Sequence, residues 1–275
     1  MLKQRLITAA ILIPLVVWAL LGLSTEVLGY ALGFVALLAA WEWLQLTGFK
    51  HKTQLSLLTA AMLATSVIVF VTVSTNVILA MTVLLWSLAT VLIIVYAHKT
   101  LPASLEMIFK KPLFGLLTAT IVLLGFVTAA SFIHAIPEQG PALLLFVLVS
   151  VWLADTGGYF AGKRFGKHKL ASAISPNKTW EGVLGALVLS GSFAILFYVT
   201  VLDTHLSLVS WLLLTVFTVM ISIVGDLFES VFKRCFNVKD SGNLLPGHGG
   251  MLDRIDSLLA ATPVFAAVLM ATGVY

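Results

Sequence analysis

The stretch that decides the fold runs from residue 208 to residue 258 and reads LVSWLLLTVFTVMISIVGDLFESVFKRCFNVKDSGNLLPGHGGMLDRIDSL. Its first part, residues 208–228, is almost entirely apolar and is long enough to cross a hydrocarbon layer ~30 Å thick as one helix. Its second part is crowded with charged side chains, although only 10% of the whole chain is charged. Ionisable groups beside a membrane span are energetically expensive, so their concentration here indicates a functional site.

The same alternation of apolar runs and short polar segments extends over the whole chain. The sequence is 60% hydrophobic, and its mean hydropathy of +1.07 exceeds what a soluble domain with a polar surface can use. Requiring roughly 17–25 apolar residues for each span, we predict nine transmembrane helices, at residues 6–23, 26–47, 55–73, 76–97, 113–134, 141–158, 182–201, 208–228 and 257–274. Long apolar runs without alternation are typical of helices and not of barrel strands. The predicted fold class is therefore an all-α, polytopic integral membrane protein with cytoplasmic polar segments.

The distribution of positive charge predicts the orientation in the membrane. With nine spans, all 16 lysines and arginines fall before the first span or after an even-numbered one, which places them on one side. The side rich in Lys and Arg is normally the cytoplasmic side. We therefore expect a cytoplasmic N-terminus and an active site that faces the cytoplasm, with the bacterial inner membrane as the expected location. The same distribution explains the net charge of +4, so nucleic acid is not an expected partner.

Two sets of acidic residues flank the polar part of the opening stretch. One set forms a stripe at helical spacing: Asp226, Glu229, Ser230 and Lys233. Asp253 and Asp256 would share a face at the start of the last span, where like charges repel. A bound cation removes that repulsion, and carboxylate oxygens suit Mg²⁺. We therefore predict Mg²⁺ ligands at Asp226, Asp253 and Asp256, although either of the last two can instead complement a helix dipole.

A second polar segment, residues 155–181, precedes the predicted span at 182–201. We expect Ser175 to cap that helix, with Pro176 at its first position. Asn177 and Lys178 then lie at a helix N-terminus, where unpaired N–H groups and the helix dipole favour a phosphate. Contact between this cationic loop and lipid headgroups is the alternative role.

A glycine-rich turn separates the two acidic sets. Gly247, Gly249 and Gly250 surround His248, and the tight turn that they allow lets backbone N–H groups approach an anion. His248 is then a candidate donor to phosphate or a candidate acid–base group. An ordinary loop histidine remains the equally open alternative.

The tripeptide Trp41-Glu42-Trp43 lies near the end of the predicted span at 26–47. Tryptophans at a membrane boundary are typical interfacial anchors, so we expect this tripeptide at the membrane surface. A cavity lined by Glu42 is the alternative.

The residues from Ser230 to Asp256 follow the pattern S-V-F-K-R-x4-K-D-x-G-x2-L-P-G-H-G-G-M-x-D-R-I-D. This pattern closely resembles the signature of phosphatidate cytidylyltransferases, also called CDP-diacylglycerol synthases. The run S-P-N-K-T-W-E-G at 175–182 is similar to the same family, as is the arrangement of Asp155, Tyr159, Gly162 and Gly166-Lys167. Residues 1–149 resemble the family only in being a hydrophobic, multi-span region. We therefore divide the chain into N-terminal transmembrane helices, 1–149, and a catalytic region, 150–275.

The resemblance implies the transfer of a cytidylyl group from CTP to phosphatidate, which releases pyrophosphate and yields CDP-diacylglycerol for phospholipid biosynthesis. It also implies a divalent metal, a second, monovalent cation such as K⁺, and a homodimer. The catalytic residues expected from it are Asp226, Lys233, Arg234, Asp253 and Asp256. The expected substrate-binding residues are Asn177, Lys178, Ser230, Lys239, Asp240, His248, Gly249, Gly250 and Arg254. The cationic members of both sets would clamp the phosphates of the two substrates.

Two other functions stay open. A CTP-dependent kinase of a lipid alcohol would direct attack at the γ-phosphorus and would need a base such as His248 or Asp240. An ion transporter would need charges near the bilayer midplane, whereas the conspicuous charges of this chain lie at predicted helix ends.

Overall fold

The structure is a computed structural model that describes residues 2–47, 49, 51–202, 206–242, 244 and 249–273, with the backbone alone for residues 2–9. Across these residues the chain forms ten α-helices and one two-stranded sheet. In chain order the elements are α1 (Leu2–Gly22), α2 (Thr25–Leu46), α3 (Lys52–Thr72), α4 (Thr75–Tyr96), α5 (Ala103–Phe109), α6 (Pro112–His134), α7 (Gly140–Phe165), β1 (Lys169–Ala171), β2 (Ser175–Thr179), α8 (Trp180–Thr200), α9 (Leu208–Cys235) and α10 (Leu252–Thr272).

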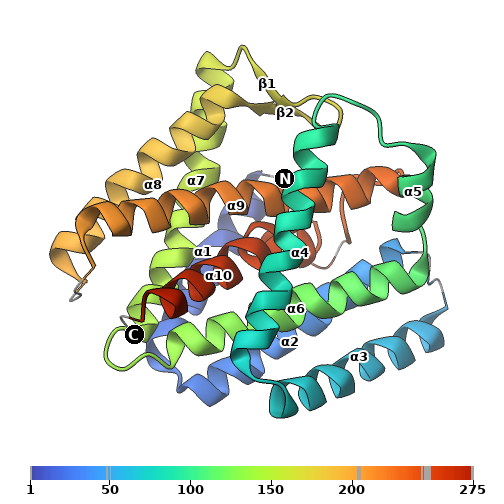
Figure 1. The fold of residues 1–275 in the computed structure, drawn as a ribbon, viewed down its shortest axis with the longest axis horizontal. Coiled ribbons are helices and arrows are strands. Elements are labelled where there is room, and N and C mark those ends of the chain that lie inside the picture. The colour runs from blue at the N-terminus through green and yellow to red at the C-terminus, as the bar shows by residue number, and fades with distance from the viewer. Residues whose placement is uncertain are drawn as a thin grey trace.

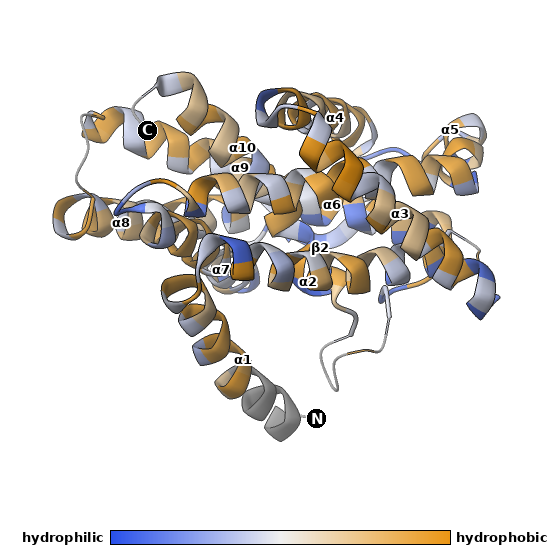
Figure 2. Ribbon diagram, turned by 90° about the horizontal axis from the view of Figure 1, so that it is seen from below, coloured by the Kyte–Doolittle hydropathy of each residue, from blue (hydrophilic) through white to orange (hydrophobic). Residues whose placement is uncertain are grey.

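Nine of these helices correspond to the nine predicted spans. Eight described helices are long and apolar enough to cross a membrane, and α1 has a shorter apolar part at Ala10–Gly22. Figure 2 shows the apolar ribbon along most helices, with hydrophilic ribbon near β2 and at helix ends. The prediction of an all-α, polytopic membrane protein is confirmed. The additional helix, α5, connects α4 to α6. It has only 7 residues, which is too short for an apolar run that predicts a span.

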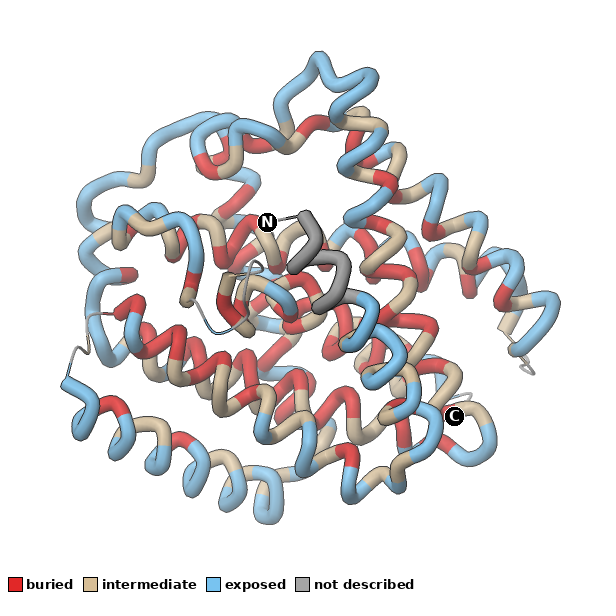
Figure 3. The backbone as a smooth tube through the Cα atoms, turned by 180° about the vertical axis from the view of Figure 1, so that it is seen from behind, coloured by how far each residue is buried: buried red, intermediate tan, exposed pale blue. Residues whose placement is uncertain are grey.

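Helices α9 and α10 lie side by side in the middle of the molecule (Figure 1). α8 packs against α9, and α7 packs closely on α8. α4 and α6 pack against α10, and α2 packs against α6. α3 lies at the edge, where Figure 3 shows a largely exposed tube and only Leu55 and Met62 are buried. The pair α9–α10 is therefore held from both sides by the other helices.

The polar stripe lies on an extension of α9 beyond its apolar run. The helix begins after Ser207, whose hydroxyl caps it by accepting a hydrogen bond from Ser210 N at 3.1 Å, and it continues to Cys235 and not only to residue 228. α10 likewise begins at Leu252, earlier than the predicted start at residue 257. The charged turns of α9 and α10 therefore lie outside the apolar segments, 208–228 and 257–274, from which the two helices were predicted.

An aromatic cluster sets the rotation of α9 about its own axis. Phe228 and Phe232 lie on one face of the helix, with their rings 5.4 Å apart. Phe232 packs edge-on against Trp43 of α2 at 5.0 Å and against Phe109 of α5 at 4.9 Å. Aromatic pairs of this kind contribute about 0.5–1.5 kcal/mol each beyond burial. Because this face is buried against α2 and α5, the face that carries Asp226 turns away from the aromatic cluster.

The prediction of an interfacial anchor at Trp41-Glu42-Trp43 is wrong. The side chains of Glu42 and Trp43 are 4% and 2% exposed, and Trp41 packs against the same core. The physical reason is that α2 is part of the bundle and Trp43 fills a gap beside Phe232, so that this turn faces protein and not the membrane surface.

The predicted helix start at Ser175 and Pro176 is also wrong. Residues Ser175–Thr179 form strand β2, which pairs antiparallel with β1 and places Thr179 opposite Lys169. Helix α8 begins only at Trp180, and its cap is Thr179, whose hydroxyl accepts a hydrogen bond from Gly182 N at 3.2 Å. Pro176 is tolerated because a strand at the edge of a sheet does not need every N–H group. Residues 177 and 178 therefore lie in a strand that leads into the helix.

Candidate active site

Three carboxylates converge where α9 lies beside α10. Asp226 and Glu229 of α9 and Asp256 of α10 each offer an oxygen atom, and these atoms lie within 4.8 Å of one another. The approach depends on Gly225, because a Cβ atom there would lie 2.6 Å from Asp256 O and 3.0 Å from Ala260 Cβ. The absence of a side chain at this position lets the two backbones come close enough for their carboxylates to meet. We name Asp226, Glu229 and Asp256 the carboxylate cluster.

Two lysines flank the carboxylate cluster. Lys178 Nζ of β2 lies 2.5 Å from Asp226 Oδ2, which connects the hairpin to α9. Lys233 Nζ lies 2.6 Å from Glu229 Oε2 and 2.9 Å from Asp253 Oδ1, so it bridges the cluster to the first turn of α10. Four carboxylates and two ammonium groups leave a formal surplus of two negative charges, which a divalent cation would balance.

The cluster also offers a buried oxygen atom to a cation. Glu229 is 3% exposed, and no described residue donates a hydrogen bond to its buried Oε1 atom. A buried polar atom without a partner costs free energy on the order of 1–3 kcal/mol. Hard carboxylate oxygens are ligands that Mg²⁺ accepts. The residues present therefore fit a divalent cation bound by Asp226, Glu229 and Asp256.

Asp253 lies outside the carboxylate cluster and organises the loop before α10. Its carboxylate accepts hydrogen bonds from Ser241 N at 3.0 Å and Gly250 N at 2.8 Å, besides its ion pair with Lys233. These partners hold both ends of the segment 241–250 together at the start of α10. Of the three predicted Mg²⁺ ligands, the structure brings Asp226 and Asp256 together, while the third carboxylate of the cluster is Glu229 and not Asp253.

The remaining predicted site residues are Arg234, which was predicted as catalytic, and most of the substrate-binding set. Arg234 donates from Nε to Ile174 O in the β1–β2 turn, at a long 3.5 Å. Ser230 is partly buried on α9, Gly250 is buried, and Gly249 adopts a positive φ of 80°. The exposed members are Asn177 on β2, Lys239 and Asp240 after α9, and Arg254 on α10. His248 lies outside the described residues.

Two residues near the site were not among the predicted site residues. Asp155 of α7 interacts electrostatically with Asp226, Lys178 and Arg254. In the sequence, the one indication of a role for Asp155 was its place in the family-like arrangement that begins at this residue. Glu42 of α2 binds the loop before α10, as described below. A carboxylate inside an otherwise apolar helix was the signal for Glu42, because such groups are rarely without a function.

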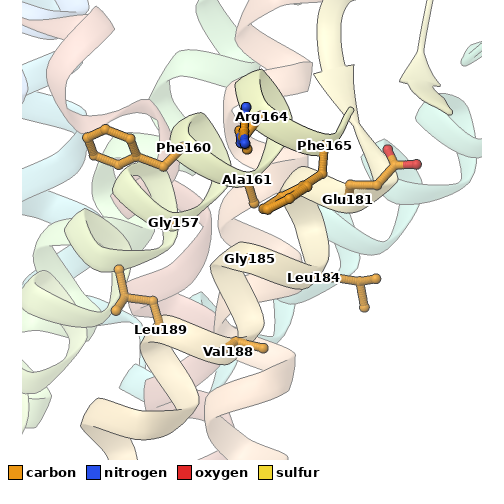
Figure 4. Close-up of a pocket in the computed structure, with 10 residues that line it drawn as sticks. All are labelled: Gly157, Phe160, Ala161, Arg164, Phe165, Glu181, Leu184, Gly185, Val188 and Leu189. Atoms are coloured by element: carbon orange, nitrogen blue, oxygen red, sulfur yellow. The ribbon is translucent and has the colours of Figure 1, made fainter. Parts of the chain in front are cut away.

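A groove between α7 and α8 differs from the carboxylate cluster in being lined mostly by apolar side chains. Its volume is about 770 Å³, and Figure 4 shows walls made by apolar side chains such as Phe160, Leu184 and Val188, with Arg164 and Glu181 near one end. The two helices approach closely here because Gly157 of α7 faces the backbone of Gly185 of α8. None of the three cluster carboxylates lines this groove, so it lacks the groups that a reaction between polyanions needs.

Comparison with known proteins shows which family the chain resembles. Residues 3–272 match the cytidylyltransferase family. The chain is 39% identical to a phosphatidate cytidylyltransferase of Haemophilus influenzae, over 97% of this chain and 98% of that protein. It is 39% identical to one of Pseudomonas aeruginosa, over 99% of this chain and 98% of that protein. It is 44% identical to one of Staphylococcus haemolyticus, over 59% of this chain and 60% of that protein.

The matches cover both halves of the chain and agree with the chemistry of the cluster. Enzymes of this family generally use a divalent metal, and a carboxylate cluster that can hold one is present. The membrane-spanning helices place that cluster in an integral membrane protein. The chain belongs to the cytidylyltransferase family and is a membrane-embedded nucleotidyltransferase.

Proposed function

We propose that this chain is a phosphatidate cytidylyltransferase, which joins CTP and phosphatidate to give CDP-diacylglycerol and pyrophosphate. An oxygen of the lipid phosphate attacks the α-phosphorus of CTP, and the bond from that phosphorus to the β-phosphate oxygen breaks. The observation that carries the proposal is the carboxylate cluster flanked by Lys178 and Lys233. The near full-length similarity to enzymes of that name supports the choice of substrates.

The reaction requires two polyanions to meet in line despite their mutual repulsion. Positioning and charge stabilisation therefore supply most of the catalysis in phosphoryl-type transfers. No nucleophilic side chain is needed, because phosphatidate is ionised before it binds. The protein must instead supply cationic groups for the phosphates and oxygen ligands for a cation.

Asp226, Glu229 and Asp256 would hold the divalent cation. When bound, such a cation would offset the negative charge of the phosphates and of the pyrophosphate leaving group. Lys178, 2.5 Å from Asp226 and next to the exposed Asn177, can share its ammonium group with a substrate phosphate. Lys233 keeps Glu229 and Asp253 in place through its two ion pairs.

Further cations bind phosphate from the rim of the site. Arg234 and Arg254 are exposed on α9 and α10, and Lys239 is exposed in the segment between these helices. A guanidinium group can bind a phosphate through two parallel hydrogen bonds, which fixes its orientation as well as its charge. We assign these residues, with Asn177, Ser230, Asp240 and the glycine loop around His248, to substrate binding.

The family resemblance also supports proposals for the cations and for the assembly. We propose Mg²⁺ as the divalent cation, a monovalent ion such as K⁺ as a second one, and a homodimer as the assembly. We also propose a bacterial inner membrane with the site on the cytoplasmic side, because the distribution of Lys and Arg supports that orientation. That side gives the site access to dissolved CTP and to lipid from the bilayer.

Labelled CTP tests the proposed reaction against its rivals. Purified protein receives CTP labelled at the α- or the γ-phosphorus, with phosphatidate in one assay and a lipid alcohol in another. We expect α-label in lipid and γ-label in pyrophosphate, with phosphatidate only. Lipid that carries γ-label with the alcohol would instead identify a kinase. No transfer in either assay would contradict an enzyme of either kind and favour a transporter.

A further inference from the structure

Glu42 lies on α2, far from the signature residues in sequence, yet its carboxylate contacts their loop. Its Oε2 atom accepts hydrogen bonds from Ser241 Oγ at 3.1 Å and from Leu252 N at 2.8 Å. Its Oε1 atom accepts one from Met251 N at 3.0 Å. The side chain is 4% exposed. A carboxylate buried to this extent is stabilised by donors, and here all three of these donors belong to the segment that leads into α10.

Two glycines of the loop make room for this carboxylate. A Cβ atom at Gly242 would lie 2.5 Å from Glu42 Oε1. A Cβ atom at Gly250 would collide with Glu42 Oε2 and with Ser241 Oγ. Both positions therefore require glycine because the Glu42 side chain occupies the adjoining space. The loop therefore has glycine at both positions that face the Glu42 carboxylate. A chance contact at the end of a helix would not require two glycines.

Glu42 and Asp253 together fix the start of α10. The first N–H groups of a helix have no partner within the helix, and Glu42 satisfies those of Met251 and Leu252. Asp253 satisfies Gly250 N and Ser241 N. Ser241 thus bonds to both carboxylates, by its side chain to one and by its backbone to the other. Asp256 of the carboxylate cluster follows one turn later on the same helix.

We infer that Glu42 is a positioning residue for the carboxylate cluster: it anchors the first turn of α10 to α2 and so places Asp256 opposite Asp226 and Glu229. The expected effect on turnover rests on the proposed function. The anchoring of α10 rests on the hydrogen bonds of Glu42 alone. The anchor is rigid on the α2 side because the neighbouring Trp43 is packed against Phe232 of α9. Glu42 and Trp43 together therefore tie α2 to both helices that carry the cluster.

The variant Glu42→Gln tests this role with little change in shape. The two amides bond to different oxygens of Glu42, and a carboxamide replaces one of those oxygens by an NH₂ group, so either Met251 N or Leu252 N loses its acceptor. We expect turnover per folded protein to fall about 10- to 100-fold, as for residues that orient metal ligands. We also expect the half-saturating Mg²⁺ concentration to rise at least about tenfold. A residue that only stabilised the fold would reduce the amount of folded enzyme and leave that concentration unchanged.

Hydrogen–deuterium exchange provides a readout that does not depend on activity. In the Glu42→Gln protein, the peptide that contains Met251 and Leu252 should exchange at least about tenfold faster than in the wild type, because its amides lose an acceptor. Glu26→Gln is the matched control: it changes the exposed carboxylate in the first turn of the same helix. We expect this control to have wild-type exchange, turnover and Mg²⁺ dependence.

Ser241→Ala extends the test should the Glu42→Gln protein fail to fold. It removes one of the three donors to Glu42 and should produce a smaller change in the same direction, about threefold in turnover and in Mg²⁺ dependence. Wild-type exchange and Mg²⁺ dependence in folded Glu42→Gln protein, or in Ser241→Ala protein if only that variant folds, would overturn the inference. A wild-type protein without cytidylyl transfer would refute the proposed function instead, and the exchange comparison would still decide whether Glu42 anchors α10.

Discussion

Within the described part of the chain, Glu229 of the carboxylate cluster has one paired and one unpaired carboxylate oxygen. It is 3% exposed, it is one of three carboxylates within 4.8 Å, and its Oε2 atom is paired with Lys233 at 2.6 Å. Its Oε1 atom has no donor among the described residues. Burial without a partner is costly for a charge, so this atom favours a cation as the missing partner. The position also illustrates how an ion pair can orient a ligand while leaving its second oxygen available.

Replacing Glu229 by Gln should therefore impair metal binding more than folding. Changes to residues around a metal typically cost about 10–100-fold in affinity or activity, and a direct ligand should cost at least ~100-fold. The measurement is cytidylyl transfer by folded protein over a series of Mg²⁺ concentrations. Glu106→Gln is the control, because Glu106 is an exposed carboxylate paired with Lys110. Overlapping Mg²⁺ curves for wild type and Glu229→Gln would refute a ligand role.

At the scale of elements, the distance between α9 and α10 determines whether the cluster forms. Gly225 is the point of closest approach, because a Cβ atom there would meet Asp256 O and Ala260 Cβ. The aromatic rings of Phe228 and Phe232 fix the rotation of α9 from its other face. Spacing and rotation together place Asp226 and Glu229 toward Asp256. Neither helix forms the site without the other.

Gly225→Ala should separate the two helices and reduce activity. The backbone oxygen of Asp256, 2.6 Å from the new Cβ atom, cannot rotate away as a side chain can. A displacement on the order of 1 Å between catalytic groups can cost roughly 100-fold in rate, and we expect a loss of at least ~10-fold. Gly191→Ala on α8 is the matched control, because no described atom lies within 4 Å of its Cβ position. Equal turnover in both variants would contradict the spacing argument.

The long helices were predictable and the short elements were not. A run of about 20 apolar residues has few alternatives in a bilayer, so all nine predicted spans correspond to observed helices. The strands β1 and β2 have 3 and 5 residues, too few for a pattern. Ser175-Pro176 was misread as a helix start because the same residue types serve as caps and at strand edges. The true cap, Thr179, became evident only from its bond to Gly182.

At the scale of the whole molecule, both parts of the sequence contribute to the surroundings of the site. The division into 1–149 and 150–275 stays a prediction. One hydrophobic core nevertheless contains Trp43 and Trp86 of the first part together with Phe228 and Leu259 of the second. The contact from Glu42 to Ser241 spans 199 positions in the chain. The sequence predicted Asp226 and Asp256 as ligands of one cation. The contact between Glu42 and Ser241, by contrast, comes from a distant helix and depends on the tertiary fold.

The orientation of the molecule in the membrane can be tested with one pair of substitutions. In a Cys235→Ala background, Ser172→Cys reports the β1–β2 turn and Ser74→Cys reports the turn between α3 and α4; both serines are exposed. The positive charges predict that residue 172 is cytoplasmic and residue 74 is on the other side. A membrane-impermeant maleimide should label Ser172→Cys only in inverted vesicles and Ser74→Cys only in right-side-out vesicles. The reverse pattern would contradict the predicted orientation.

The central claim is that the carboxylate cluster drives metal-dependent cytidylyl transfer, and Asp256→Asn tests it most directly. The substitution keeps the size of the side chain and removes one charge from the group of three. Wild-type and variant proteins of equal folded content are given α-labelled CTP, phosphatidate and Mg²⁺, and label in lipid is measured with released pyrophosphate. We predict equal amounts of both products from the wild type and at least ~100-fold less from Asp256→Asn. Wild-type turnover by a folded Asp256→Asn protein would contradict the account.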